Sequence, residues 1–191
     1  MFNANSRQHR ARQDGLQYST YKFDSQARCI EMVTVDTDGE TDGLTTYEYD
    51  SRGDLTRQID YESTGKVFSI EDMKYSQDHK LLFQAARNHG PNNGPSLEHD
   101  WSREYKYDAH GNQTDMFTYR KGILEAHWIS TYNERNRLIT SQTIVANEQK
   151  DLNTYGFCGD CGLSSGTTTY KYDSQDRLIE ERAFQPGDKL V

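Results

Sequence analysis

A short pattern that ends in a turn recurs along this chain and limits what it can fold into. The clearest copies begin Tyr-x-Tyr-Asp, at Tyr47–Asp50, Tyr105–Asp108 and Tyr170–Asp173. Weaker copies place Asp, Ser or Asn at the fourth position. The six anchor residues are Asp24, Asp50, Ser76, Asp108, Asn133 and Asp173. A repeat of about 26 residues with two insertions is typical of an array of one supersecondary unit.

Each copy has the features of a β-hairpin. Two aromatic residues at alternate positions lie on one face of a strand, and an Asp, Asn or Ser then opens a turn. Three residues later, a left-handed residue would close a type I turn with a bulge. The residues at that position are Ala27, Gly53, His79, Gly111, Asn136 and Asp176. Five of the six are of types that tolerate positive φ, so we predict a hairpin at every copy.

Alternating apolar and polar residues follow the turns, for example over residues 55–62, 113–119, 138–145 and 178–184. This alternation predicts half-buried antiparallel strands. Two arms per hairpin give about twelve strands, enough to make an open sheet curl. We therefore expect an all-β fold, a curled antiparallel β-meander of about six hairpins, open or partly closed. Residues 18–191 should form a single domain after a flexible N-terminal tail at 1–17.

The composition excludes some classes of binding partner. The 30 acidic residues against 22 Lys and Arg give a net charge of −8, which repels phosphate backbones, so we expect no nucleic-acid partner. No apolar run is long enough for a membrane-spanning helix, and we expect no membrane partner. The N-terminus lacks the basic-then-apolar order of a signal peptide. We therefore expect a cytoplasmic protein, unless the chain is excised from a longer exported one.

The motif resembles the YD repeats of Rhs proteins and teneurins, in which Tyr-x-Tyr-Asp-x-x-Gly-Arg-Leu recurs every twenty-odd residues. The resemblance covers about residues 18–186. It implies a β-sheet protein of the kind that encloses a toxin domain or makes extracellular contacts, and hence a scaffold or binding role. The chain departs from the family pattern where Gly-Arg-Leu appears as Asp176-Arg177-Leu178 or Asn136-Arg137-Leu138.

We therefore expect a non-enzymatic protein-binding or scaffold module, with a protein partner such as a toxin domain in an interbacterial toxin system. One alternative is an immunity protein that neutralises a cognate Rhs-type toxin, and another is an enzyme of unknown type. The sequence contains no nucleophile elbow, phosphate-binding loop or His-Glu-x-x-His motif. We predict no catalytic residues, and the oligomeric state stays open.

Three aromatic residues are the candidate binding residues: Trp101, Tyr105 and Trp128. Trp101 lies beside the Gly/Pro stretch of the insertion at residues 89–102, which we expect to be a loop, and long loops often carry binding. Exposed aromatic side chains also form protein-binding hot spots. The paired tyrosines of the repeats have a second interpretation as core between two layers, which we favour. They are Tyr47, Tyr49, Tyr105, Tyr107, Tyr170 and Tyr172.

The longest insertion contains Cys158 and Cys161 in a Cys-x-x-Cys arrangement. This spacing suits half of a zinc site or a redox disulfide. Zinc would require Cys29 or histidines brought in by folding, so we favour free thiols and expect no cofactor. The acidic residues around Gly39 superficially resemble a calcium loop. They lack the EF-hand order, and a solvated hairpin loop is the interpretation we favour.

Overall fold

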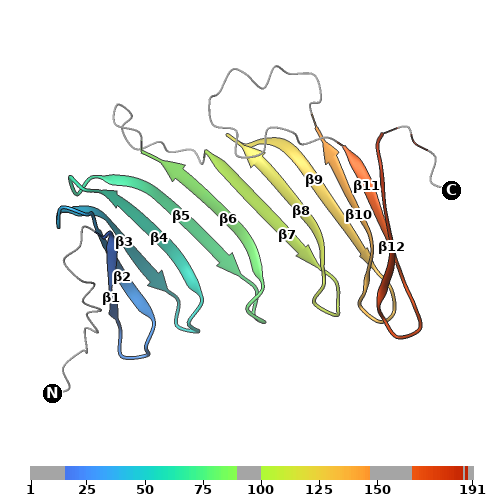
Figure 1. The fold of residues 1–191 in the computed structure, drawn as a ribbon, viewed down its shortest axis with the longest axis horizontal. Coiled ribbons are helices and arrows are strands. Elements are labelled where there is room, and N and C mark those ends of the chain that lie inside the picture. Colours follow the sequence, from blue (N-terminus) through green and yellow to red (C-terminus); the bar gives the residue numbers. More distant parts are fainter. Residues whose placement is uncertain (1–15, 90–99, 147–164, 187, 189–191) are drawn as a thin grey trace. The chain divides into compact units, whose positions relative to one another are not determined.

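The computed structural model describes residues 16–89, 100–146, 165–186 and 188. The chain forms two compact units, residues 1–100 and residues 101–191. Both units consist of antiparallel strands and connecting turns (Figure 1). The first unit contains β1 (Tyr18–Phe23), β2 (Cys29–Val35), β3 (Thr41–Tyr49), β4 (Leu55–Glu62), β5 (Val67–Tyr75) and β6 (Leu81–Asn88). The second contains β7 (Trp101–Tyr107), β8 (Gln113–Arg120), β9 (Ile123–Tyr132), β10 (Leu138–Val145), β11 (Gly166–Tyr172) and β12 (Leu178–Phe184).

Within each unit the strands lie in chain order, and each pairs antiparallel with the next. The predicted all-β meander of hairpins is confirmed. In neither unit does the first described strand pair with the last. No helix in the described ranges is long and apolar enough to span a membrane. The flexible tail predicted for residues 1–17 lies almost entirely outside the described residues, and the single domain predicted for 18–191 stays a prediction.

The six predicted turns all adopt the predicted backbone geometry. In the second repeat, Gly53 N donates to Asp50 O at 3.1 Å and Asp50 N donates to Asp54 O at 2.9 Å. The third residue after every anchor has positive φ, from 59° at Asn136 to 92° at Gly53. Ala27 has a φ of 61°, although alanine is a poor residue for this conformation. The turn geometry therefore prevails over local residue preference in the first repeat.

The anchor side chain explains why Asp recurs at the start of the turns. Asp50 Oδ1 accepts hydrogen bonds from Arg52 N and Asp54 N, both at 2.9 Å. Asn133 Oδ1 accepts the equivalent pair in its own turn, and Ser76 Oγ accepts one bond from Lys80 N at 3.0 Å. These bonds satisfy backbone amides that no strand partner reaches. The side chain of the anchor therefore helps to set the turn conformation.

A bulge follows each of these turns and fixes the register of the hairpin. Glu48 pairs with Arg57 while Tyr49 pairs with Leu55, so one residue of β4 is extra. The turns at the other ends of the strands were not predicted in detail. Residues 36–40 and 62–66 form the same turn as the anchors do, and β8 and β9 are joined by Lys121 and Gly122, both with positive φ. The acidic stretch around Gly39 is thus a hairpin turn, in which Asp36 Oδ1 accepts from Asp38 N and Glu40 N.

Successive repeats are joined by hydrogen bonds from side chains to the neighbouring backbone. The hydroxyl of Tyr49 donates to Cys29 O at 2.8 Å, and the hydroxyl of Tyr132 donates to Gln113 O at 2.9 Å. In both cases the tyrosine immediately before the anchor of one turn bonds to the residue five positions after the anchor of the preceding turn. Along the turns, Arg52 Nη1 donates to Ser76 O at 2.7 Å. In these two repeats, the second aromatic residue of the motif therefore holds one hairpin to the previous one.

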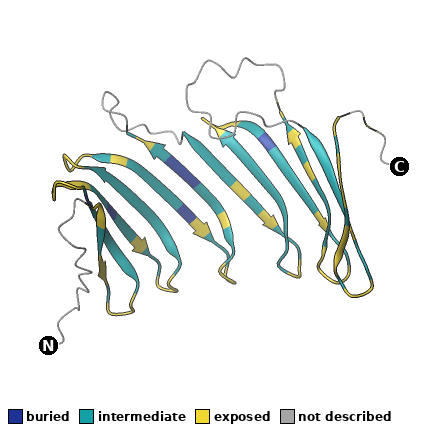
Figure 2. Cartoon of the chain, in the orientation of Figure 1, coloured by how far each residue is buried: buried dark blue, intermediate teal, exposed yellow. Residues whose placement is uncertain are grey.

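Neither unit has a conventional hydrophobic core among the residues described. The buried apolar residues are Val35, Met73, Ala85, Ala86 and Ala126, and no large side chain is fully buried. Most strand residues are of intermediate exposure (Figure 2). The repeat tyrosines that we favoured as a core between two layers are only half-buried. That expectation is wrong because each unit presents them on the face of a single sheet.

Candidate functional site

Large side chains form a row across three strands of the second unit. Tyr105 of β7 is opposite Met116 of β8, and Met116 is opposite Trp128 of β9. Residues directly opposite in antiparallel strands lie on the same face. Two of the three predicted binding residues, Tyr105 and Trp128, are therefore brought to one face with Met116 between them.

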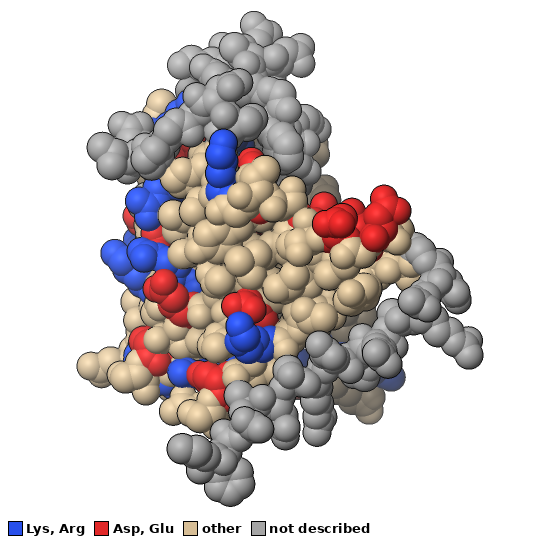
Figure 3. All heavy atoms as spheres, turned by 90° about the vertical axis from the view of Figure 1, so that its left-hand side faces the viewer, with Lys and Arg blue, Asp and Glu red and all other residues tan. Residues whose placement is uncertain are grey.

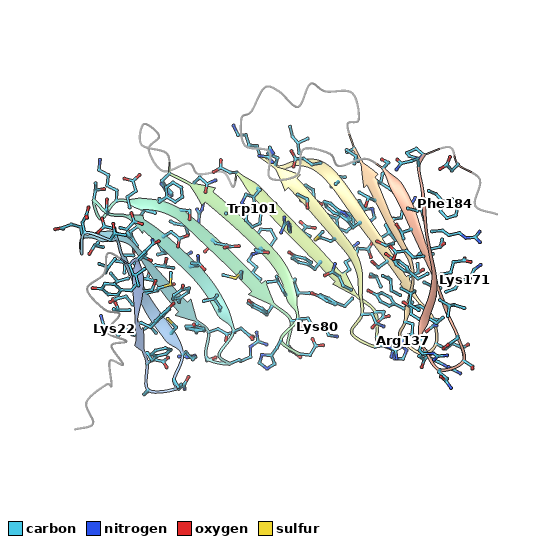
Figure 4. All side chains as sticks on the ribbon, viewed as in Figure 1. Lys22, Lys80, Trp101, Arg137, Lys171 and Phe184 are labelled. Carbon is cyan, nitrogen blue, oxygen red and sulfur yellow. The ribbon has the colours of Figure 1, made fainter. Side chains whose placement is uncertain are left out.

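Trp101 lies on the same face as Tyr105, because the two residues are four apart in one strand. It is the first residue of β7, and Figure 4 shows it at that end of the strand. The prediction that residues 89–102 form a loop is wrong for Trp101 and Ser102, which pair with Arg120 and Tyr119 of β8. The residues 90–99 lie outside the described ones. Trp101 is thus an anchor on a strand, which holds it more firmly than a loop would.

Arg103 stands between Trp101 and Tyr105 on this face. Its guanidinium carbon lies 5.3 Å from the centroid of the Trp101 ring, a distance typical of a cation–π contact. Arg103 is opposite Thr118, which is in turn opposite the fully buried Ala126. Because Ala126 is small, the surface of this face is formed by the larger side chains around it. Trp101, Arg103, Tyr105, Met116 and Trp128 are together called the aromatic face.

All five residues of the aromatic face are half-buried. Aromatic residues, methionine and arginine are the types enriched at protein–protein interfaces. Tryptophan, tyrosine and arginine also dominate measured hot spots. Arg103 and Met116 were not among the predicted binding residues. Arg103 could have been found from its parity with Trp101 and Tyr105, whereas Met116 required the strand register.

The opposite face of the second unit contains a different cluster. His127 Nε2 lies 2.8 Å from Asp115 Oδ1, and the His127 ring stacks on Phe117 with centroids 4.0 Å apart. Burial acts to raise the pKa of Asp115, but the hydrogen bonds from His127 and Thr114 outweigh it and lower that pKa. These groups satisfy one another's hydrogen bonds and packing, so we interpret the cluster as a structural contact between strands.

In the first unit, the face with the repeat tyrosines has a polar centre instead of an aromatic row. Asp60 accepts hydrogen bonds from Thr45 Oγ1 at 2.8 Å, from Ser69 Oγ at 2.7 Å and from Gln58 Nε2 at 3.2 Å. Thr45 is opposite Asp60, and Asp60 is opposite Ser69, so the three share one face. Figure 3, which views the β1 end, shows charges of both signs around an uncharged area. The aromatic face of the second unit is therefore the stronger binding candidate.

The predicted metal candidates, Cys158 and Cys161, lie outside the described residues. Within the described ranges, no group of three or more His, Cys, Asp and Glu could hold a metal ion. Cys29 is half-buried and its Sγ lies 3.4 Å from Glu31 O. The zinc hypothesis at Cys158 and Cys161 stays untested.

No protein-family model matches this chain, and no curated protein matches it. Among solved structures, TcdB2-TccC3 without its hypervariable C-terminal region is similar, with a TM-score of 0.49 and 16% sequence identity. The similarity covers 88% of this chain and 9% of that chain. A porin-like protein from Bacteroides uniformis has a TM-score of 0.44 and 12% identity, covering 74% of this chain and 67% of its own. The chain thus spans a small fraction of the first of these proteins.

Proposed function

We propose that this chain is a YD-type β-hairpin module that binds a protein partner through the aromatic face. The observation that carries the proposal is the row Tyr105, Met116 and Trp128 on adjacent strands, extended by Trp101 and Arg103. Half-exposed rings on regular strands are already ordered, so binding would cost little side-chain entropy. A partner that covers the row would complete the burial that the single sheet layer leaves unfinished.

The proposed role is that of a scaffold, with no catalytic residue assigned. The repeat turns support the resemblance to YD repeats, because the anchor, the left-handed residue and the bulge recur in all six hairpins. A toxin domain is the partner that this resemblance implies. A protein that fixes such a domain needs a rigid, wide surface, which antiparallel strands supply.

Affinity capture of the tagged protein from its native lysate, followed by mass spectrometry, tests the proposal. One partner in stoichiometric amount, lost when Trp101 and Trp128 are both replaced by alanine, is the expected result. A captured toxin whose activity is blocked by complex formation would identify an immunity role within the same binding function. Turnover of a substrate by the purified chain, abolished by one carboxylate or cysteine substitution, would contradict the proposal.

A further inference from the structure

Strand β12 forms one edge of the second unit. Among the described strands it pairs with β11 alone, so the backbone amides and carbonyls along its other side have no strand partner. Five of its seven residues, including Ile179, Glu181 and Arg182, are exposed, and Ile179 is 64% exposed. An exposed edge of this kind is a template for pairing with another chain.

The side chains of β12 divide into two sets that the register with β11 defines. Glu180 is opposite Lys171, and Arg182 is opposite Thr169, so Glu180 and Arg182 lie on one face. Glu181 is opposite Tyr170, and Ala183 is opposite Thr168, on the other face. Figure 4 labels Lys171 and Phe184 on these two strands. A second strand placed against β12 would meet charges on one face and a mainly uncharged row, apart from Glu181, on the other.

The sequence Ile179-Glu180-Glu181-Arg182-Ala183 is complementary to itself in the antiparallel sense. In a pair of β12 strands related by a two-fold axis at Glu181, Glu180 of each copy is opposite Arg182 of the other. Ile179 is likewise opposite Ala183 in both halves. Opposite charges directly across a strand pair are stabilising, and they occur twice in this arrangement.

Only this register gives the charge match. A two-fold axis perpendicular to the sheet keeps each side chain on its own face of the sheet. Because opposite residues must share a face, one residue has to lie opposite its own copy at the axis. Centring it on Glu180 places two Glu180 side chains opposite each other and Ile179 opposite Glu181. Centring it on Arg182 places two Arg182 side chains opposite each other and leaves Glu181 against Ala183. All three registers place two like charges opposite each other at the centre, Glu181 against Glu181 in the proposed one. Only the register centred on Glu181 also creates opposite-charge pairs among residues 179–183.

The edge strand β1 of the first unit differs from β12. Strand β1 has Lys22 as its only charged residue. No two-fold register of β1 can therefore create an ion pair across the axis. Of these two strands, only β12 has this complementarity.

We infer that the occupant of the β12 edge is β12 of a second copy of this chain, in a two-fold dimer with Glu180 opposite Arg182 in both directions. Such an isologous contact closes on itself and stops at two copies. A contact of five residues per strand is at the low end of the size of specific interfaces. We therefore expect a weak dimer that forms only at high protein concentration. The dimer is independent of the aromatic face, so failure of either proposal leaves the other standing.

Disulfide trapping tests the register in the full chain after Cys29, Cys158 and Cys161 are replaced by serine. In the variant Glu181→Cys, the two new cysteines are directly opposite, with Cα atoms about 4.5–5.5 Å apart, which a disulfide can bridge. Mild oxidation should yield a covalent dimer rapidly. The control Glu134→Cys, an exposed residue in the turn between β9 and β10, should cross-link at least tenfold more slowly. Equal rates for the two variants would overturn the inference.

Sedimentation at high protein concentration tests the charge match. Arg182→Glu turns two attractive pairs into repulsive ones and should raise the dimer dissociation constant roughly tenfold. The triple variant Lys171→Glu, Glu180→Arg, Arg182→Glu restores opposite charges across the axis. It also keeps residues 171 and 180 oppositely charged, as in the observed pair at 2.8 Å. Recovery of the dimer is expected, whereas a triple variant that stays monomeric, or a wild-type protein that grows beyond two copies, would contradict the proposal.

Discussion

At the scale of single residues, the turn position with positive φ is the strictest requirement of the repeat. The sequence predicted this position in all six hairpins because the requirement is local and involves only five consecutive residues. Ala27 shows that the requirement holds even where the residue is unsuited. The two glycine turns reach larger φ values, 92° at Gly53 and 89° at Gly111, which side chains rarely adopt.

Exchanging residues between equivalent turn positions tests this requirement. Gly53→Ala should destabilise by about 1 kcal/mol, because alanine in the left-handed region is strained. The new methyl group would meet only Arg28 Nη1, at 4.0 Å, so the cost is one of backbone conformation rather than of a clash. Ala27→Gly should instead stabilise by about 0.5 kcal/mol, the relief of strain exceeding the entropy cost of glycine. Urea unfolding of both variants measures the effects, and the same sign for both would contradict the account.

The anchor carboxylates predict how stability depends on pH. The pKa of Asp24 is lowered mainly by the hydrogen bond from Arg28 N, and the pKa of Asp173 mainly by that from Arg177 N. A lowered pKa in the folded state adds stability above the ordinary value of 3.8 that is lost as the pH falls through the folded-state pKa. The urea midpoint should therefore drop as the pH falls below about 5.

Asp173→Asn separates charge from turn geometry, because Asn133 already forms the same two backbone bonds with a neutral amide. The variant should keep the hairpin and lose part of the decline between pH 5 and pH 3. Urea midpoints across that range measure the difference. The exposed carboxylate variant Glu134→Gln is the control and should follow the wild-type curve. A decline in Asp173→Asn as steep as in wild type would show that the anchor charge adds nothing.

At the scale of elements, the hairpins are held to one another by side-chain bonds as well as by strand pairing. The strands themselves were predicted well: residues 138–145 and 178–184 are β10 and β12 as expected. The hydroxyl bonds of Tyr49 and Tyr132 could not be predicted, because they join residues 20 and 19 positions apart through the register of neighbouring strands. The row of Tyr105, Met116 and Trp128 was hidden for the same reason. The sequence pattern determines on which face of its strand a residue lies. The register between strands determines which residues are its neighbours on that face.

Removing a single hydroxyl tests the link between repeats. Tyr49→Phe and Tyr132→Phe should each destabilise by about 1 kcal/mol, because Cys29 O or Gln113 O loses a hydrogen bond while the ring is retained. Tyr61→Phe is the matched control, since that hydroxyl makes no hydrogen bond among the described residues. Chemical denaturation of the three variants provides the comparison. A loss in Tyr61→Phe equal to that in Tyr49→Phe would assign the effect to the ring environment.

At the scale of the whole molecule, the scarcity of buried apolar side chains is the main thermodynamic feature. Alanine accounts for three of the five buried apolar residues described, and alanine contributes little apolar area. Stability must then rest more on strand hydrogen bonds, turns and half-buried tyrosines than on a packed interior. Such a protein gains the most when a partner covers one of its faces.

Calorimetry tests this distribution of stability. The heat capacity of unfolding scales with the apolar area that becomes exposed, and typical globular proteins show about 12–15 cal/mol/K per residue. A value clearly below that range is expected for the isolated chain. A value within the range would mean that a packed core exists, and would contradict the single-layer account.

The most direct test of the central claim is the dissociation constant of the captured partner for two matched variants. Trp128→Ala removes the aromatic ring at the β9 end of the row, while Ile144→Ala removes a 42% exposed side chain that lies opposite His127 on the other face of the same unit. Loss of a hot-spot residue costs 2 kcal/mol or more, so Trp128→Ala should weaken binding by roughly thirtyfold or more. Ile144→Ala should leave it unchanged. Equal affinity of Trp128→Ala and wild type, or a loss confined to Ile144→Ala, would show that the partner does not bind the aromatic face.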